Sequence, residues 1–161
     1  MTQFEGLLSV LKDEGVSFII IGGVAATFHG SARLTNDLDV VYERSPENIE
    51  RLAKALAPLN PYLRGAPRGL PFRFDPPTIK RGLNFTLTTD LGDLDLLGEL
   101  TGVGSFAAVA RESVEATLFE SIYLFINLDG LIRSKRAAGR AKDLEVVAEL
   151  EAIREERDRQ E

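Results

Sequence analysis

The sequence predicts a single α/β (α+β) domain in which a mixed β-sheet is flanked by helices. Short apolar runs rich in β-branched residues alternate with segments whose apolar residues recur at a helical period. Two alternating runs on either side of Gly92 predict a β-hairpin. A chain of 161 residues that is 44% hydrophobic can bury one core, and no repeat or linker divides it.

The first part of the chain predicts helices and strands in alternation. Apolar residues three and four positions apart predict an amphipathic helix over 2–14. The nearly all-apolar run 16–21 is typical of a strand covered on both faces, and a short helix over 24–28 and a strand over 36–42 follow. A serine N-cap, a proline at the first helical position and an apolar stripe predict a helix over 46–57.

The later elements are predicted on the same grounds. Alternating residues indicate the hairpin strands 84–88 and 93–97, and the segment 114–126 contains one or two further strands. Apolar stripes predict one helix that begins at Leu128 and a last helix that begins near Asp143.

The segment 58–82 interrupts the pattern, because it holds six of the seven prolines and no sustained period. A loop of this length in a small domain is typically functional or mobile. Basic residues gather in it and again in 131–142, where they could contact a nucleic acid or simply form solvated faces. These residues are Arg64, Arg68, Arg73, Lys80 and Arg81, followed by Arg133, Lys135, Arg136, Arg140 and Lys142.

Composition and the chain ends exclude several classes of protein. The sequence has no cysteine, which excludes disulfides and thiolate metal sites, and its net charge of −6 argues against a uniformly basic surface. The first residues do not form a signal peptide and no apolar run could span a bilayer, so we expect a cytoplasmic protein without a membrane partner. We assign 1–153 to the domain and expect the almost wholly charged segment 154–161 to be a solvated, fraying end.

Two Asp-x-Asp pairs are the strongest sign of chemistry in the sequence. Side chains alternate along a strand, so Asp37 and Asp39 share one face of their strand, as Asp93 and Asp95 do on theirs. If the strands are neighbours, the carboxylates converge and repel one another unless something positive lies among them. An all-oxygen cluster selects a hard cation such as Mg²⁺. The alternative is that these aspartates line a solvated sheet edge.

A glycine pair precedes the first of these strands. Gly22 and Gly23 lie where a buried strand passes into a helix, and backbone N–H groups at such a junction suit phosphate oxygens. Glycine permits close approach of the backbone to a phosphate, although a tight turn alone also explains the pair. The segment matches neither a Walker loop nor a dinucleotide-binding fingerprint.

The order strand, Gly-Gly, short helix and Asp-x-Asp resembles the DNA polymerase β-type nucleotidyltransferase superfamily. Three segments look like small AbiEii-type toxin nucleotidyltransferases, and together they span about Val16 to Leu150. They are GGVAATFHGSARLTNDLDV, NFTLTTDLGDLDLLGEL and LIRSKRAAGRAKDLEVVAEL.

The resemblance implies a single nucleotidyltransferase domain that binds ATP or another NTP and transfers its NMP to a hydroxyl group. Asp37, Asp39 and Asp95 would hold two Mg²⁺ ions, and Asp95 would also take the proton of the attacking hydroxyl. The family pattern selects Asp95 because two leucines follow it, whereas spacing alone leaves Asp93 equally open.

The relatives also suggest an acceptor and a setting. They point to tRNA as acceptor, in a toxin–antitoxin or phage-defence system with a cognate antitoxin as partner. A small molecule, as in aminoglycoside adenylylation, or a protein side chain remains open. The alternatives to an enzyme are a nucleotide-binding module that keeps the fold and a structural protein whose acidic cluster binds a stabilising cation.

Lys135 is expected to support the site. It takes an inward position of its helix, where it could direct its charge past an apolar stem to water or reach a triphosphate. Asp143 lies on the inward stripe of the last helix, so a Lys135–Asp143 pair is expected. Arg33 suits a phosphate or a surface ion pair. The single histidine, His29, suits capping or packing better than catalysis, and Ser31 suits a turn or a phosphate contact.

Overall fold

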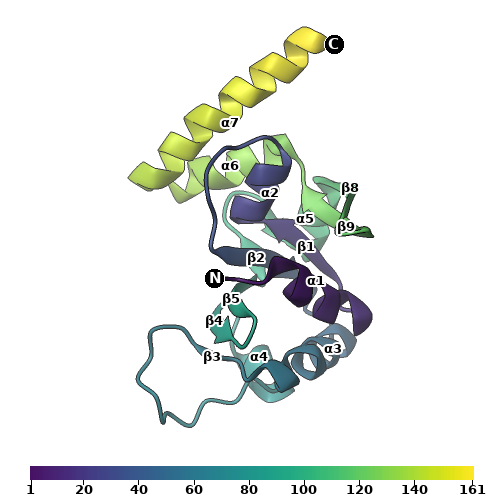
Figure 1. Ribbon diagram of the computed structural model, residues 1–161, viewed down its shortest axis with the longest axis vertical. Helices are drawn as coiled ribbons and strands as arrows, with labels where there is room; N and C mark the ends of the chain where they lie inside the picture. The colour runs from purple at the N-terminus through teal and green to yellow at the C-terminus, as the bar shows by residue number, and fades with distance from the viewer.

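The computed structural model describes all residues 1–161 and has a seven-stranded mixed sheet with helices around it, which confirms the predicted fold class (Figure 1). The strands of the main sheet are β1 (Phe18–Ile21), β2 (Asp37–Tyr42), β3 (Tyr62–Leu63), β4 (Phe85–Thr89), β5 (Gly92–Leu97), β8 (Ser113–Leu118) and β9 (Ser121–Ile126). A small separate sheet pairs β6 (Glu99–Leu100) with β7 (Gly104–Ser105). The helices are α1 (Phe4–Asp13), α2 (Gly22–Phe28), α3 (Pro46–Leu56), η1 (Ala57–Leu59), α4 (Pro76–Arg81), α5 (Phe106–Arg111), α6 (Leu128–Ala138) and α7 (Ala141–Gln160).

The strand order of the main sheet is β3-β4-β5-β2-β1-β9-β8. The predicted hairpin is present as the antiparallel pair β4 and β5, and 114–126 forms a second hairpin, β8 and β9. At the centre, β1 is antiparallel to β2, while β2 is parallel to β5 and β1 is parallel to β9. The two strands that carry Asp-x-Asp are therefore direct neighbours.

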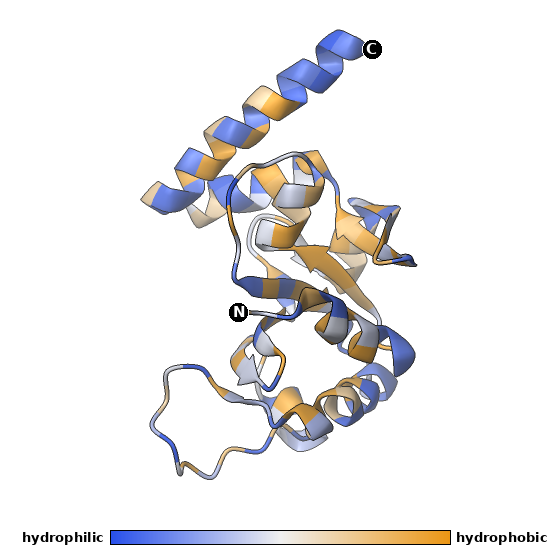
Figure 2. Ribbon diagram, viewed as in Figure 1, coloured by the Kyte–Doolittle hydropathy of each residue, from blue (hydrophilic) through white to orange (hydrophobic).

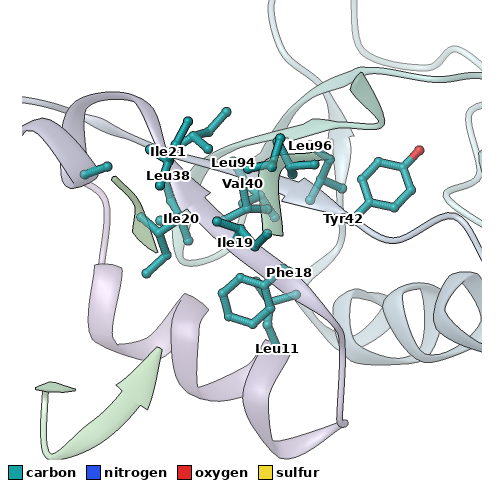
Figure 3. Close-up of a cluster of buried hydrophobic side chains, with 14 of the residues drawn as sticks. Leu11, Phe18, Ile19, Ile20, Ile21, Leu38, Val40, Tyr42, Leu94 and Leu96 are labelled. Carbon is teal, nitrogen blue, oxygen red and sulfur yellow. The ribbon is translucent and has the colours of Figure 1, made fainter. Parts of the chain in front are cut away.

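The core forms around β1, whose four residues are all buried. Figure 3 shows Phe18, Ile19 and Ile20 among side chains of the neighbouring strands and Leu11 of α1. Figure 2 shows the same division by hydropathy, with an apolar central strand and a hydrophilic outer part of α7. Burial on both faces explains why this run is almost entirely apolar.

The segment 58–82 is more regular than its prolines predicted. Part of it belongs to η1, β3 pairs with β4, and α4 begins at Pro76. Pro76 and Pro77 fit there because the first turn of a helix needs no N–H donors, and Asp75 caps it by accepting a hydrogen bond from Thr78 N at 3.0 Å. Only the stretch between β3 and α4 remains an irregular loop (Figure 1).

The C-terminal end of the chain is more regular than expected, although residues 155–161 are exposed. Residues 154–160 continue α7 without a break and form helix rather than an irregular end. Arg154 forms an ion pair with Asp129 at 3.2 Å, and Arg157 donates to the His29 carbonyl oxygen at 3.1 Å. The domain limit at 153 stays a prediction. None of the helices combines the length and apolar character needed to cross a bilayer.

Candidate active site

The register of two parallel strands brings the aspartates together. Asp37 of β2 lies opposite Asp93 of β5, and Asp39 lies opposite Asp95. Asp37, Asp39 and Asp95 each offer one carboxylate oxygen to a cluster in which these atoms lie within 4.8 Å of one another. The predicted convergence is therefore observed, and Asp95, not Asp93, completes the group of three. We call Asp37, Asp39 and Asp95 the carboxylate triad.

Asp39 is the most perturbed member of the carboxylate triad. Burial is the main cause that raises its pKa to about 8, and a hydrogen bond with Asp95 and the charges of Asp95 and Asp37 add to the rise. Its Oδ1 atom is buried without a hydrogen-bond partner. An unpartnered, crowded carboxylate oxygen is unfavourable unless a cation satisfies it, so the triad fits a hard divalent ion.

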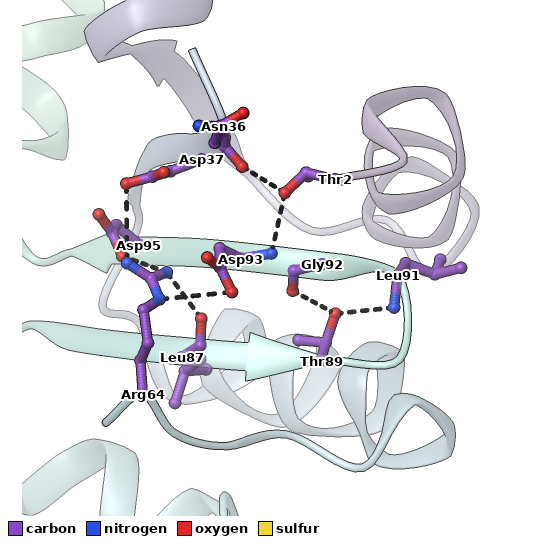
Figure 4. A network of polar contacts seen from close by, with 10 residues as sticks. All are labelled: Thr2, Asn36, Asp37, Arg64, Leu87, Thr89, Leu91, Gly92, Asp93 and Asp95. Atoms are coloured by element: carbon purple, nitrogen blue, oxygen red, sulfur yellow. Dashed lines mark hydrogen bonds and ion pairs between the residues drawn. The ribbon is translucent and has the colours of Figure 1, made fainter. Parts of the chain in front are cut away.

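The N-terminal residues hold the two aspartate strands in register. Thr2 is buried, and its hydroxyl donates to the Asn36 carbonyl oxygen just before β2. The Thr2 hydroxyl oxygen also accepts a hydrogen bond from the Asp93 amide of β5 at 3.1 Å (Figure 4). Gly92 leaves room for Thr2, because a Cβ there would overlap the threonine. The sequence pattern gave no indication of this bridge.

The glycine pair allows the turn to lie against the carboxylate triad. Gly22 has a φ of +64°, a conformation that favours glycine, and a Cβ there would overlap the Asp39 carboxylate. A Cβ on Gly23 would overlap the Thr35 side chain. The pair is thus required by close packing within the chain, and α2 begins at Gly22 rather than Val24.

Arg64 is the positive group that lies among the acidic side chains. Its Nη2 donates to Asp95 Oδ1 at 2.8 Å and to the Leu87 carbonyl oxygen at 2.7 Å (Figure 4). Its Nε lies 3.5 Å from Asp93 Oδ1, and its Nη1 lies 3.6 Å from Asp37 Oδ2. From the sequence, Arg64 was predicted only as one of several basic residues in a loop, because no local pattern indicates that β3 pairs with β4.

Lys135 and Asp143 form the predicted pair. Lys135 Nζ lies 3.6 Å from Asp143 Oδ1, and the Asp143 side chain is almost completely buried. A hydrogen bond from Arg140 is the main cause that lowers the Asp143 pKa, and the Lys135 charge contributes. Asp143 therefore stays charged and fixes the lysine. The Lys135 charge in turn opposes the rise of the Asp39 pKa, and Lys135 lines the same cleft as the triad.

An open cleft of about 390 Å³ joins the acidic and basic sides. The carboxylate triad lines this cleft together with four basic residues, which we call the basic wall. From the sequence, Arg140 and Lys142 were predicted only as part of a basic surface patch. Their position in the sequence just before the inward Asp143 could have indicated that they reach the cleft. The basic residues of this wall are Arg33, Lys135, Arg140 and Lys142.

The segment after α2 is held by α7. Ser31 Oγ donates to Glu149 Oε1 at 2.6 Å, which is the main cause that lowers the Glu149 pKa. Arg33 lines the cleft and also pairs with Glu149 at 3.6 Å and with Glu145 at 3.8 Å. Arg33 thus forms the predicted surface ion pair, and its place in the cleft is also compatible with the predicted phosphate contact. Ser31 serves as a tether between these segments.

His29 lies outside the cleft. It is 5% exposed, and its Nε2 lies 2.7 Å from the Ile126 carbonyl oxygen while Arg157 Nη2 lies 3.2 Å from its Nδ1. Burial is the main cause that lowers its pKa. These contacts favour the packing role over catalysis.

Comparison with known proteins gives a fold but no close relative. No family model and no curated protein matches the chain. TM1012, a Thermotoga maritima protein assigned as a nucleotidyltransferase, superposes with a TM-score of 0.58 at 12% identity, covering 92% of this chain and 94% of its own. The solution structure of the antibiotic-resistance factor ANT(2'')-Ia gives 0.59 at 14% identity, covering 98% and 90%. ANT(2'')-Ia with adenylyl-2''-tobramycin gives 0.56 at 14% identity, covering 98% and 97%.

The chain has the nucleotidyltransferase fold. Identities of 12% to 14% support the fold alone.

Proposed function

We propose that this protein is a Mg²⁺-dependent nucleotidyltransferase that moves an NMP from an NTP to a hydroxyl group. The observation that carries this proposal is that the carboxylate triad and the basic wall line one open cleft. A triphosphate needs positive charge around it, and its metal ion needs oxygen ligands. The cleft offers both, on a fold shared with other nucleotidyltransferases.

Asp37, Asp39 and Asp95 are the residues that would hold the metal. Their all-oxygen donor set suits Mg²⁺, and the unpartnered Asp39 Oδ1 supports a cation at this point. When bound, Mg²⁺ would neutralise phosphate charge and orient the reacting oxygens, and the family resemblance suggests two ions.

The basic wall would bind the triphosphate. Lys135, held by Asp143, would face the phosphates, and Arg33 would add a second contact from the segment after α2. The backbone of Gly22, which packs against Asp39, and that of Gly23, which packs against Thr35, would border the same phosphates.

The reaction is a displacement at the α-phosphorus. The acceptor oxygen forms a bond to this phosphorus, the bond to the β-phosphate oxygen breaks, and pyrophosphate leaves. Asp95 would accept the proton of the acceptor hydroxyl, as the resemblance suggests, and Lys135 would stabilise charge on the departing pyrophosphate.

The acceptor is the finer part of the proposal. ANT(2'')-Ia has been solved with an adenylylated tobramycin, which makes a small-molecule acceptor one candidate. The exposed basic residues Arg73 and Lys80 of the segment 58–82 instead favour an anionic acceptor such as tRNA. The toxin–antitoxin or phage-defence setting and an antitoxin partner rest on the sequence resemblance.

The decisive experiment incubates the protein with each α-labelled NTP, Mg²⁺ and, separately, total RNA, cell protein or aminoglycosides. We expect label in one acceptor class with wild type and none with Asp37→Asn. A thermal-shift assay adds a test that needs no acceptor: NTP should raise the melting temperature more with Mg²⁺ than with EDTA, and Asp37→Asn should lose this difference while staying folded. Equal shifts in both proteins would contradict the assignment.

A further inference from the structure

Arg64 occupies a special position in the acidic cluster. Its guanidinium faces Asp37 and Asp95, two members of the carboxylate triad, and also Asp93, which lies outside the triad. Only 26% of the side chain is exposed, so water screens these ion pairs less than those of a surface arginine. Of the basic side chains that form ion pairs, only Arg64 contacts Asp37 or Asp95 directly.

The backbone of Arg64 is held by the sheet independently of its side chain. The Arg64 amide donates to the Thr86 carbonyl oxygen at 3.0 Å and so extends the pairing of β3 with β4. The next residue, Gly65, has a φ of +81° and begins the irregular loop, and a Cβ there would meet no atom within 4 Å. The guanidinium could thus leave the carboxylates without disturbing the sheet.

We propose that Arg64 is an internal counter-ion that competes with the divalent cation for Asp37 and Asp95. This inference rests on the proposed function, since it assumes that the carboxylate triad is the metal site. A guanidinium and a metal ion neutralise the same carboxylates, and their positive charges repel each other at this range. Arg64 therefore stabilises the protein without metal and weakens the binding of free cation.

The competition makes cation binding depend on nucleotide. A triphosphate adds negative charge to the cleft, so a metal ion and Arg64 can then be accommodated together. Free Mg²⁺ alone must instead displace or oppose the guanidinium. Arg64 in this role is a positioning residue that selects the metal–nucleotide complex over the bare ion.

The test measures Mn²⁺ affinity by electron paramagnetic resonance, without nucleotide and then with a non-hydrolysable NTP analogue. Arg64→Gln should tighten the Kd for Mn²⁺ alone by about tenfold and change the Kd much less when the analogue is present. Arg64→Lys keeps the positive charge but loses the planar guanidinium and its paired donors. Its Kd for Mn²⁺ alone should therefore lie between those of wild type and Arg64→Gln.

A matched control separates this role from general charge. Arg68 lies in the loop that follows Arg64, with its Cζ atom 5.0 Å from the centroid of the Tyr62 ring. Arg68→Gln therefore removes a charge from this loop and should leave the Kd for Mn²⁺ unchanged. Melting temperatures show whether each variant is folded. Without metal, Arg64→Gln should have a lower melting temperature than wild type, and Mn²⁺ should raise its melting temperature by more than it raises that of wild type.

The outcomes separate the inference from the proposed function. If wild type binds Mn²⁺ and Arg64→Gln binds it equally or more weakly, the competition is wrong and Arg64 only orients Asp95. If neither protein binds Mn²⁺ even with the analogue, the metal site itself is refuted, and the inference with it.

Discussion

The two Asp-x-Asp strands have the same local pattern but different surroundings. In β2, both Asp37 and Asp39 belong to the carboxylate triad. In β5, only Asp95 does, while Asp93 pairs with Arg64. The difference follows from position along the strands, because Asp93 lies at the level of Asp37 and near the Thr2 bridge, whereas Asp95 lies beside the buried Asp39.

This contrast shows that a repeated motif need not repeat its role. In the inner pair, Asp95 lies close enough to Asp39 to raise the Asp39 pKa through a hydrogen bond and through its charge. The outer pair, Asp37 and Asp93, shares the guanidinium of Arg64. Substitutions along the two strands can test the contrast directly.

The largest effect is expected for Asp39→Asn. Removing the central carboxylate should lower turnover by at least about 10³-fold, measured as label transfer from the NTP. The same change should stabilise the metal-free protein by about 1–3 kcal/mol at pH 8 in a denaturant titration. A raised folded-state pKa contributes stability below about pH 4 that is lost as the pH rises through about 8, and asparagine abolishes this loss. A less stable mutant would contradict the crowding of Asp39.

The next effect compares the two aspartates of β5. Asp95→Asn should lower turnover by about 10³-fold, whereas Asp93→Asn should lower it by less than about tenfold. Single-turnover rates with saturating NTP and Mg²⁺ measure both. Equal losses would mean that the two strands are equivalent after all and that the triad is not the functional unit.

A smaller effect is expected on the basic wall. Lys135→Met keeps much of the apolar stem and removes the charge, so the fold should persist while kcat falls by about 10²-fold. Arg33→Gln is the comparison, because Arg33 is about half exposed and already paired with α7. It should act mainly on KM, by less than about tenfold. A larger loss of kcat for Arg33→Gln than for Lys135→Met would contradict this assignment of roles to the two residues.

The smallest effect concerns His29, which follows the helix after the glycine turn but does not line the cleft. Its pKa is lowered, so its contribution to stability is present above about pH 6.5 and is lost as the pH falls through its folded-state value. His29→Gln should therefore weaken this pH dependence of unfolding and leave turnover at pH 7.5 unchanged. A large loss of turnover would place His29 within the site.

Local sequence patterns predicted much of the fold because helices, strands and caps depend on residues that are close in the sequence. The period of two in 37–42 and 93–97 gave the shared faces of the aspartates, and the cap before Pro46 gave α3. In 58–82, the density of prolines concealed β3 and α4. Proline is compatible with the first turn of a helix, so its presence alone did not indicate a loop.

The sequence by itself determined the chemical character of the site: paired carboxylates on strands, a glycine turn before them and an inward Lys135 with a partner in Asp143. Tertiary structure decided which aspartates meet, through the register of β2 and β5, and it placed Arg64 beside Asp95, 31 residues away in the sequence. Strand order and register depend on how the whole core packs. No local period encodes them, so a residue such as Arg64 acquires its partners only when the sheet is assembled.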